Sequence, residues 1–259
     1  MITAGIDCGA KNTKAVILKD GQIVGRGTVP SGFDQNAAVS ESLKIALTNA
    51  GVSMDQVCSI GGTGCGVKSI RQTDLVINDI KAIAAAAHFF SPDARTVVDI
   101  GAEGGRAVRC NEKGIVVDFA VNEKCAAGAG AFIESMSRAL ETPLEELGNL
   151  ALASDTTISI NAQCTIFAES EVVGLIHAKT EKKDISKAIH DALAGRIASM
   201  IRRIGINPEV VMMGGVACNQ GIVIPLKKEL GIDRIYIPDF PSFGAAVGSA
   251  VIAAAETKE

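Results

Sequence analysis

Hydrophobic and polar positions follow one pattern that occurs twice along the chain. Residues 4–24 (AGIDCGAKNTKAVILKDGQIV) and 97–117 (VVDIGAEGGRAVRCNEKGIVV) each contain an apolar run ending in Asp-x-Gly, a short turn, a second apolar run and a glycine turn. Short apolar runs bounded by glycine and polar residues are typical of strands joined by tight turns. The pattern therefore predicts the same β-hairpin, with a third strand, in two copies that place Asp7 and Asp99 at equivalent positions.

Apolar residues spaced three and four positions apart predict helices between and after these copies. Residues 40–51 and 78–90 have this spacing, with Ser40 and Asn78 as expected N-caps and Gly51 as a C-cap. Further helices are predicted over residues 128–140, 166–178, 185–204 and 241–255, and short strands near 56–64, 210–213 and 235–238. Because strands that alternate with helices are typical of α/β proteins, we predict α/β lobes.

Composition narrows the class of protein. Hydrophobic residues make up 47% of the 259 residues, yet no uncharged apolar run reaches the roughly 18 residues that cross a bilayer. The start has no secretory n-region, so we predict a cytoplasmic protein with no membrane partner. A net charge of −4 without a basic block, and 3% aromatic residues, predict that nucleic acid is not a partner.

The seven cysteines are an odd number without a C-x-x-C pair, which disfavours a disulfide framework.

The first Asp-x-Gly turn has the chemistry of a phosphate site. Successive backbone amides can bind a phosphate where glycine permits close approach, and Thr13 and Lys14 add a hydroxyl group and a cation. Asp7 and Asp99 would hold Mg²⁺ through water, since this ion keeps much of its hydration shell and takes one or two carboxylates. Each Asp-x-Gly alone is compatible with an ordinary tight turn, but the duplication favours two halves that share one ligand. The expected contacts from this turn are Gly9, Ala10, Lys11, Asn12, Thr13 and Lys14.

A third glycine element follows the strand predicted at 210–213. Gly214 and Gly215 lack β-carbons, which lets a flat ligand lie against the backbone, and Asn219 could hydrogen-bond a ribose or a base. The alternative is a glycine end to a parallel strand, with no ligand. The sequence contains neither the G-x-x-x-x-G-K-[ST] of a P-loop nor the G-x-G-x-x-G of a dinucleotide site.

These motifs resemble those of the actin, sugar-kinase and Hsp70-type ATPase superfamily. DCGAKNTK is similar to its first phosphate loop, DIGAEGGRA to its second and MMGGVACN to its adenosine loop, and the resemblance covers essentially the whole chain. It implies a two-lobed actin-like (ribonuclease H-like) α/β fold around an ATP cleft, with Gly101 and Ala102 as contacts of the second loop. We expect residues 1–95 plus 240–259 to form the first lobe and residues 96–239 the second. The alternative is a small-molecule kinase of the sugar type, although its catalytic aspartate and sugar pocket have no identifiable counterpart here.

Two of the cysteines precede predicted helices. Cys125 stands before AAGAGAFIESMSRAL, and Cys164 stands before TIFAESEVVGLIHA. The amino end of a helix carries exposed amides and the positive end of the dipole, which favour a thiolate and an anionic group bound to it. Two thiolates are too few for a zinc or iron–sulfur site, which normally takes four protein ligands, and a twofold dimer would supply the missing pair.

The segments NEKCAAGAGAF and NAQCTIFAESEV strongly resemble the ATP-dependent activators of 2-hydroxyacyl-CoA dehydratases and the ATPase subunits of benzoyl-CoA reductases. The resemblance implies that Cys125 and Cys164 from each of two subunits hold one 4Fe-4S cluster at the dimer interface. It also implies an ATPase that passes one electron from reduced ferredoxin or flavodoxin through this cluster to a CoA-ester dehydratase or reductase component. The remaining cysteines lie outside the motif and are expected to be packing residues or loop thiols.

The second phosphate loop departs from the family. Many activators carry Gly-Gly-Gln-Asp where this chain has Gly101, Ala102, Glu103 and Gly104. Glu103 thus replaces the glutamine held to orient the attacking water; a carboxylate could act as a general base, or hydrolysis could be slow. The run GAEGGRAV is more similar to one of the two unlike ATPase chains of benzoyl-CoA reductases, so a heterodimer with a sister chain stays open beside a homodimer. An ATP-gated regulatory protein without turnover is a further alternative.

Overall fold

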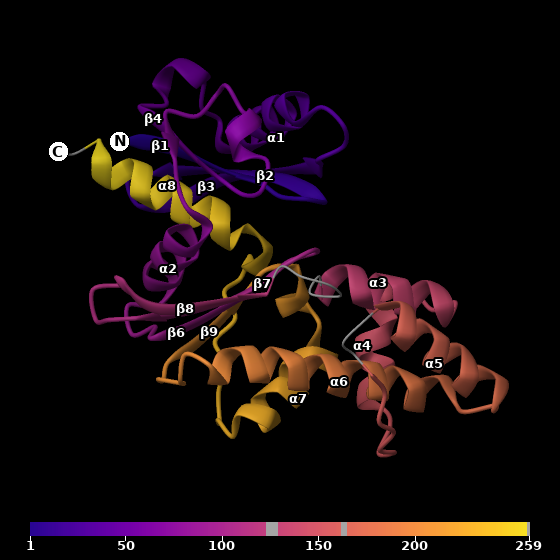
Figure 1. Cartoon of the computed structure of the whole chain (residues 1–259). Coiled ribbons are helices and arrows are strands. Elements are labelled where there is room, and N and C mark those ends of the chain that lie inside the picture. The colour runs from indigo at the N-terminus through magenta and orange to yellow at the C-terminus, as the bar shows by residue number, and fades with distance from the viewer. Residues whose placement is uncertain (123–128, 162–164, 258–259) are drawn as a thin grey trace. The chain divides into compact units, whose positions relative to one another are not determined.

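The computed structural model describes residues 1–122, 129–161 and 165–257. The chain forms two compact units, each with its own sheet and helices (Figure 1). Unit 1 comprises Met1–Val97, Cys110–Val117 and Phe243–Glu259, and unit 2 comprises Val98–Arg109 and Asp118–Ser242. Residues 110–117 thus pack with unit 1, although we assigned them to the second lobe; the predicted lobe boundaries stay a prediction.

Unit 1 is built on a five-stranded sheet with the order β3-β2-β1-β4-β5. Its strands are β1 (Ile2–Cys8), β2 (Asn12–Lys19), β3 (Gln22–Pro30), β4 (Ser59–Thr63) and β5 (Leu75–Val76). β1 and β2 pair antiparallel with Asp7 opposite Lys14, and β1 and β4 pair in parallel with Asp7 beside Thr63. The first copy of the predicted hairpin is therefore present, and Asp7 lies between Lys14 and Thr63 in the sheet.

The helices of unit 1 pack against this sheet or against one another, in part through small residues. They are α1 (Gln35–Ala50), α2 (Asp79–Phe90) and α8 (Gly244–Glu256), with the 3-10 turns η1 (Met54–Gln56), η2 (Val67–Ser69) and η4 (Pro241–Phe243). A β-carbon on Gly5 of β1 would lie 1.9 Å from the carbonyl oxygen of Ala246, and one on Gly248 would lie 1.7 Å from that of Ala82. Glycine at these two positions lets α8 lie directly against β1 and α2.

Local capping signals predict some helix ends correctly and one incorrectly. The side chain of Asn78 caps α2 as expected, and Gly51 ends α1 in the left-handed conformation with φ +63°. The predicted start of the first helix at Ser40 is wrong, because Asp34 caps α1 more than one turn earlier. Ser40 instead donates its hydroxyl to the carbonyl of Asn36 within the helix.

The second sheet has the order β8-β7-β6-β9 and contains the second copy of the repeat. Its strands are β6 (Thr96–Ile100), β7 (Gly105–Cys110), β8 (Val116–Asn122) and β9 (Val210–Met213). The strand predicted at 235–238 is reduced to a single parallel bridge between Val211 and Tyr236. The duplication in the sequence thus corresponds to two sheets that each begin with a β-hairpin.

The helices of unit 2 surround one hydrophobic core. They are α3 (Ala129–Ala139), α4 (Leu144–Leu152), α5 (Thr165–His177), α6 (Lys182–Arg202) and α7 (Gln220–Leu230), with the 3-10 turn η3 (Gly215–Cys218). Phe132, Leu147, Ile189 and Leu226 are buried together in the core of this unit. The sequence predicts α3, α5 and α6 to within a few residues but not α4 or α7.

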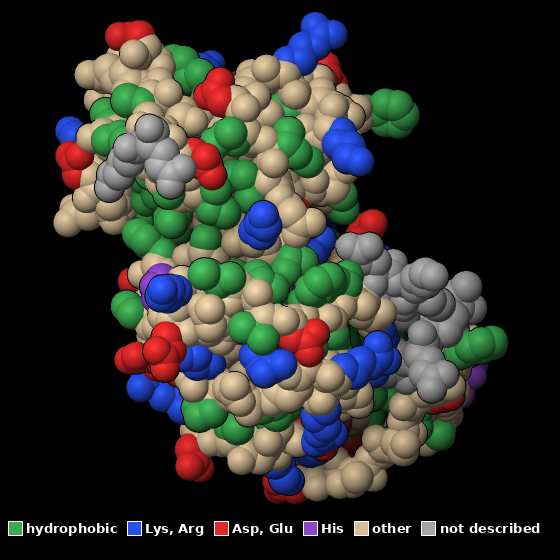
Figure 2. Space-filling model, turned by 60° about the vertical axis from the view of Figure 1, so that its left-hand side comes forward, with side chains coloured by type: hydrophobic (Ala, Val, Ile, Leu, Met, Phe, Trp, Pro, Cys, Tyr) green, Lys and Arg blue, Asp and Glu red, His purple; other side chains and the backbone are tan. Residues whose placement is uncertain are grey.

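Two features of the described residues bear on partners. Within the described residues, no helix is both long and apolar enough to cross a membrane. On the face shown in Figure 2, Lys and Arg side chains lie among Asp and Glu side chains. This face therefore offers charges of both signs to a partner.

Candidate active site

The carboxylate of Asp7 lies at the end of β1 and pairs with Lys14 across the hairpin. Oδ2 of Asp7 is 3.3 Å from Nζ of Lys14, and 15% and 18% of these two side chains are exposed. The pair follows from the antiparallel register, which sets the two residues opposite each other. The hairpin thus brings a carboxylate and an ammonium group together beside the first Asp-x-Gly turn, and both are groups that nucleotide sites use around a phosphate.

The first turn is held from inside by hydroxyl groups. Oγ of Ser31 donates to the carbonyl of Gly9 at 2.6 Å and lies 2.9 Å from Oγ1 of Thr13. A β-carbon on Gly9 would lie 2.7 Å from the carbonyl oxygen of Asn12, so this tight turn requires glycine. Thr13 is fully buried, and its hydroxyl faces Ser31 in the interior. Ser31 is a supporting residue that sequence reasoning missed, and the predicted phosphate contacts of Gly9, Ala10, Lys11, Asn12, Thr13 and Lys14 stay predictions.

The second copy repeats the carboxylate–cation pair. Asp99 on β6 has 8% of its surface exposed, and its Oδ2 lies 3.8 Å from Nη1 of Arg106 on β7. Asp99 and Arg106 occupy the positions in the second copy that Asp7 and Lys14 occupy in the first. Each copy therefore supplies one partly buried carboxylate with a basic neighbour.

The second turn is attached to α3 by main-chain hydrogen bonds. The amide of Gly101 donates to the carbonyl of Gly104 at 2.9 Å and closes the turn. The amides of Gly130 and Ala131 donate to the carbonyls of Gly101 and Ala102 at 3.1 and 2.9 Å. The first N–H groups of a helix lack partners within it, so the turn satisfies donors that α3 cannot satisfy itself. Glu103, at the tip of this turn, is exposed.

The third glycine element has one packed glycine and one open glycine. Gly214 has φ +87°, and a β-carbon there would lie 2.2 Å from the carbonyl oxygen of Ile100. Gly214 is therefore required by packing against β6. A β-carbon on Gly215 would meet nothing within 4 Å, so packing does not require glycine at this residue, and a ligand contact there stays a prediction.

Asn219 has a structural role in this element. Its Oδ1 accepts a hydrogen bond from the amide of Gly221 and caps α7, while its Nδ2 lies 3.1 Å from Nε2 of His190 on α6. His190 is fully buried, and burial lowers its pKa, so the ring is neutral and can accept from the Asn219 amide. A contact between Asn219 and a ribose or base stays a prediction.

The thiols outside the cysteine motif divide into buried and exposed ones. Burial raises the pKa of Cys110 to about 11 and also raises the pKa of Cys8. These two groups therefore remain thiols at neutral pH, which makes them poor metal ligands. Cys58, Cys65 and Cys218 are exposed.

The two cysteines of the motif, Cys125 and Cys164, lie outside the described residues. The helices that follow them are described, and these contact each other: Oγ of Ser135 on α3 donates to Oε2 of Glu169 on α5 at 3.3 Å. Phe132 of α3 and Val172 of α5 also belong to the same buried core. The chain segments after the two cysteines are thus packed together in unit 2.

The described residues do not offer enough ligands to hold a metal ion by protein side chains alone, whereas Mg²⁺ needs few of them. Within residues 1–122, 129–161 and 165–257, no group of three or more His, Cys, Asp and Glu residues could hold a metal ion. Mg²⁺ in nucleotide sites takes one or two carboxylates and completes its shell with water and phosphate oxygens. A Mg²⁺ site that includes Asp7 and Asp99 stays a prediction.

Comparison with known proteins identifies the group to which these features belong. The model of the BadF/BadG/BcrA/BcrD ATPase family matches residues 4–253. The chain belongs to this family. The family predicted from the cysteine motif is therefore confirmed, and the function class is that of an ATPase.

Three relatives are similar to this BadF/BadG/BcrA/BcrD ATPase over nearly their whole length. The 2-hydroxyisocaproyl-CoA dehydratase activator of Clostridioides difficile is 35% identical over 100% of this chain and 97% of its own. The (R)-2-hydroxyglutaryl-CoA dehydratase activating ATPase of Acidaminococcus fermentans is 34% identical over 97% of this chain and 96% of its own. A benzoyl-CoA reductase subunit of Thauera aromatica is 29% identical over 96% of this chain and 92% of its own.

Solved structures confirm the fold class of this family member. The activator of the 2-hydroxyisocaproyl-CoA dehydratase from Clostridium difficile with bound ADPNP has a TM-score of 0.93 and 35% identity, over 100% of this chain and 96% of its own. Component A of the (R)-2-hydroxyglutaryl-CoA dehydratase from Acidaminococcus fermentans has a TM-score of 0.95 and 33% identity, over 100% of both chains. The predicted α/β fold of the actin-like ATPase type is thus confirmed.

Proposed function

We propose that this ATPase is an electron activator, which hydrolyses ATP and passes one low-potential electron to an enzyme that reduces or dehydrates a CoA ester. The observation that carries the proposal is similarity over nearly the whole chain to two activators of CoA-ester dehydratases and to a benzoyl-CoA reductase subunit. Transfer of an electron to a poor acceptor requires a donor with a lowered reduction potential. At about 1.4 kcal/mol per 59 mV, a few hundred millivolts requires roughly 5–10 kcal/mol, which ATP hydrolysis can supply.

The residues proposed for ATP are those of the three glycine elements and the two aspartates. Asp7 and Asp99 would hold Mg²⁺ through water, and the ion would neutralise charge on the phosphates when bound. Lys14 already faces a carboxylate oxygen at 3.3 Å and would face the phosphates from the same position. Glu103 is exposed and would accept the proton of the attacking water, so that ATP and water give ADP and phosphate. Gly215, where a β-carbon would meet nothing within 4 Å, would let the nucleotide approach the backbone, and Gly101, Ala102 and Gly214 are the neighbouring contacts that we propose.

The proposed electron site is one 4Fe-4S cluster held by Cys125 and Cys164 from each of two subunits. Four thiolates are the normal ligand set of such a cluster, and each chain would supply two of them. Contact between α3 and α5 supports the proposal, because the segments that follow both cysteines are held in one packed unit. When bound, the cluster would take up one electron from reduced ferredoxin or flavodoxin and release it to the acceptor enzyme.

The contact between the second turn and α3 supports a route from nucleotide to electron site. Gly101 and Ala102 accept hydrogen bonds from the first turn of α3, and α3 follows the segment that contains Cys125. A change in this turn on ATP binding or hydrolysis would therefore move the amino end of α3. Movement of a helix dipole and of solvent relative to a metal centre changes its potential.

The proposed partners are a second subunit and a CoA-ester dehydratase or reductase component. Phe167, Val173 and Ile176 on α5 are 64%, 41% and 38% exposed, and contact with another subunit would remove these apolar side chains from water. We propose a homodimer first, because identity to the two dehydratase activators exceeds identity to the benzoyl-CoA reductase chain of Thauera aromatica. A heterodimer with a sister chain stays the alternative. The proposed location is the cytoplasm.

Anaerobic purification tests the function. We expect a brown dimer with about four irons, and loss of iron in both Cys125→Ser and Cys164→Ser. Reduced ferredoxin with ATP should then supply electrons to a dehydratase component, while ADP should not replace ATP. Cys218→Ser is the matched control, since this exposed thiol lies outside the motif and its loss should leave the iron content unchanged. A colourless monomer would contradict the proposal.

The small-molecule kinase has less support than the activator. Its support is the fold class alone, whereas the activator has relatives at about one-third identity over nearly the whole chain. ADP release that depends on an added sugar, by a protein without iron, would favour the kinase. ADP release without any sugar, by the iron-containing protein, would favour the activator.

A further inference from the structure

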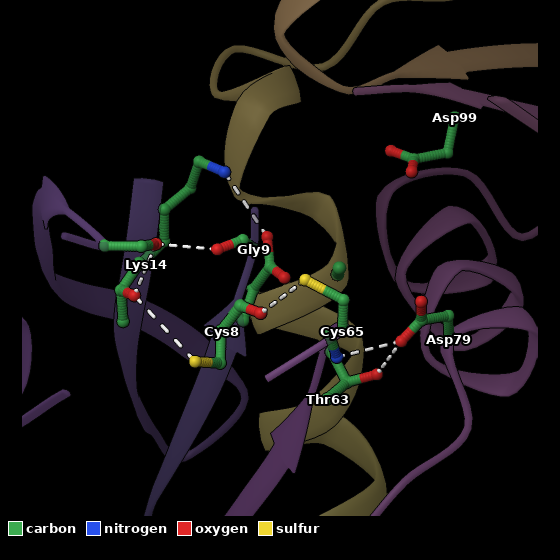
Figure 3. Close-up of polar contacts among 12 residues, drawn as sticks. Cys8, Gly9, Lys14, Thr63, Cys65, Asp79 and Asp99 are labelled. Carbon is green, nitrogen blue, oxygen red and sulfur yellow. Dashed lines mark hydrogen bonds and ion pairs between the residues drawn. The ribbon is translucent and has the colours of Figure 1, made fainter. Parts of the chain in front are cut away.

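A turn that the sequence analysis did not assign to the site lies directly against Asp7. β4 pairs in parallel with β1, and its last residue, Thr63, is the register partner of Asp7. The residues after Thr63 turn back over the end of β1, where the amide of Gly66 donates to the carbonyl of Cys8 at 3.1 Å. The Sγ of Cys65 donates to the same carbonyl at 3.5 Å (Figure 3). The turn over residues 63–66 therefore covers the strand end that carries Asp7.

Gly64 is the point of closest approach between this turn and the Asp7 carboxylate. It has φ +95°, in the left-handed region that favours glycine. A β-carbon on Gly64 would lie 2.5 Å from the carbonyl oxygen of Cys8 and 2.8 Å from Oδ1 of Asp7. The backbone of Gly64 thus forms one wall of the space in which the Asp7 carboxylate can turn.

Asp79 holds the turn in this position. Its Oδ1 accepts hydrogen bonds from Oγ1 of Thr63 at 2.5 Å and from the amide of Gly64 at 2.8 Å. Thr63 is fully buried, so water cannot replace the acceptor for its hydroxyl at low cost. Asp79 is the first residue of α2, and the positive end of the helix dipole favours a carboxylate there. One carboxylate oxygen therefore accepts hydrogen bonds from two donors of the turn.

We propose that Asp79 is a positioning residue of the nucleotide site: through Thr63 and Gly64 it fixes the wall that orients the Asp7 carboxylate. The inference rests on the proposed function, in which Asp7 binds Mg²⁺ with the nucleotide. Asp79 itself would contact neither. Its loss would leave two donors without their acceptor, let the turn relax and widen the range of Asp7 orientations.

The test measures the effect of Mg²⁺ on ADP binding, so it does not depend on turnover. Calorimetric titration of the full-length protein with ADP gives one dissociation constant in Mg²⁺ and one in EDTA. The Mg²⁺ ratio of each variant is its dissociation constant in EDTA divided by that in Mg²⁺. We expect Asp79→Ala to lower the benefit of Mg²⁺ by roughly 10-fold to 100-fold, the scale at which small misplacements reduce function in such sites. Asp79→Asn keeps an acceptor oxygen and should restore most of the benefit.

Asp74 provides a matched control at the other end of the same strand. Its Oδ2 accepts a hydrogen bond from the amide of Ile60 at 2.8 Å, near the start of β4. Asp74→Ala removes a comparable carboxylate-to-amide bond and should lower the melting temperature while leaving the Mg²⁺ ratio unchanged. If Asp79→Ala fails to fold, Thr63→Val takes its place, because it removes one of the two donors and should lower the ratio several-fold.

The outcomes separate this inference from the proposed function. A normal Mg²⁺ ratio in Asp79→Ala, or in Thr63→Val where that variant replaces it, overturns the positioning role and leaves the proposed function intact. Equal losses in Asp79→Ala and Asp74→Ala overturn it as well, since they indicate general loosening of unit 1. An unaltered protein that binds ADP equally with and without Mg²⁺ overturns the metal role of Asp7 and this inference together.

Discussion

The amide of Gly130 donates a hydrogen bond to the carbonyl oxygen of Gly101, 3.1 Å away, and thereby joins the start of α3 to the second Asp-x-Gly turn. A β-carbon on Gly130 would lie 2.9 Å from Cα of Ala102 and 3.0 Å from the Gly101 oxygen. This close contact leaves little room for any residue larger than glycine.

Gly130→Ala should therefore lower the free energy of unfolding by about 1–3 kcal/mol, the usual range for an overpacked contact. Denaturant unfolding measures this change. Gly195→Ala on α6 is the control, because its β-carbon meets nothing within 4 Å and the helix should gain about 0.5–1 kcal/mol. Equal stabilisation by both substitutions would show that the turn does not restrict α3.

Lys14→Met should destabilise unit 1 by about 1.5–3 kcal/mol, because it leaves the partly buried Asp7 carboxylate without its charged hydrogen-bond partner. Urea unfolding at neutral pH measures the loss. Lys44→Met is the comparison: Lys44 is 75% exposed in its pair with Glu41, so screening by water should keep that change near zero. The prediction fails if the two variants unfold at the same urea concentration.

The free energy of unfolding should depend on pH through His190. Burial lowers the pKa of His190 from the ordinary value of 6.5, so the unfolded chain binds its proton more readily than the folded one. The contribution of His190 to the free energy of unfolding is therefore fully present above pH 6.5. It falls by about 1 kcal/mol per pH unit as the pH decreases from 6.5 toward the pKa of the folded state.

Melting temperatures between pH 5 and 8 test this prediction. His190→Gln should remove the dependence assigned to His190, whereas His177→Gln, at the exposed end of α5, should retain it. An unchanged pH profile in His190→Gln would assign the dependence to other groups.

Gly248→Ala should disrupt the packing of α8 against α2. Its β-carbon would lie 1.7 Å from the carbonyl oxygen of Ala82, and a backbone atom cannot move aside as a flexible side chain can. We expect a loss of about 1–3 kcal/mol in thermal unfolding, or more if the helix cannot shift. Gly174→Ala on α5, where a β-carbon meets nothing within 4 Å, should be tolerated.

The sequence by itself determined the repeated architecture and much of the local structure. The equivalent positions of Asp7 and Asp99 at strand ends could be predicted, because apolar runs and glycine turns are local signals in the sequence. Such signals do not depend on which residues are in contact in the folded chain. The cap at Asn78 and the left-handed Gly51 were predictable for the same reason. The cysteine motif indicated the family from neighbouring residues alone.

Tertiary structure decided the features that depend on residues far apart in the chain. Asp79 reaches the Asp7 strand end only because β4 lies beside β1, which no periodicity in the sequence reveals. The inward hydroxyl of Thr13 depends on Ser31, which follows the end of β3. α4 and α7 meet at Gly148 and Gly221, where a β-carbon on either would collide with the other helix or its cap. Short helices of this kind are stabilised by packing more than by their own sequence, so only the folded chain shows them.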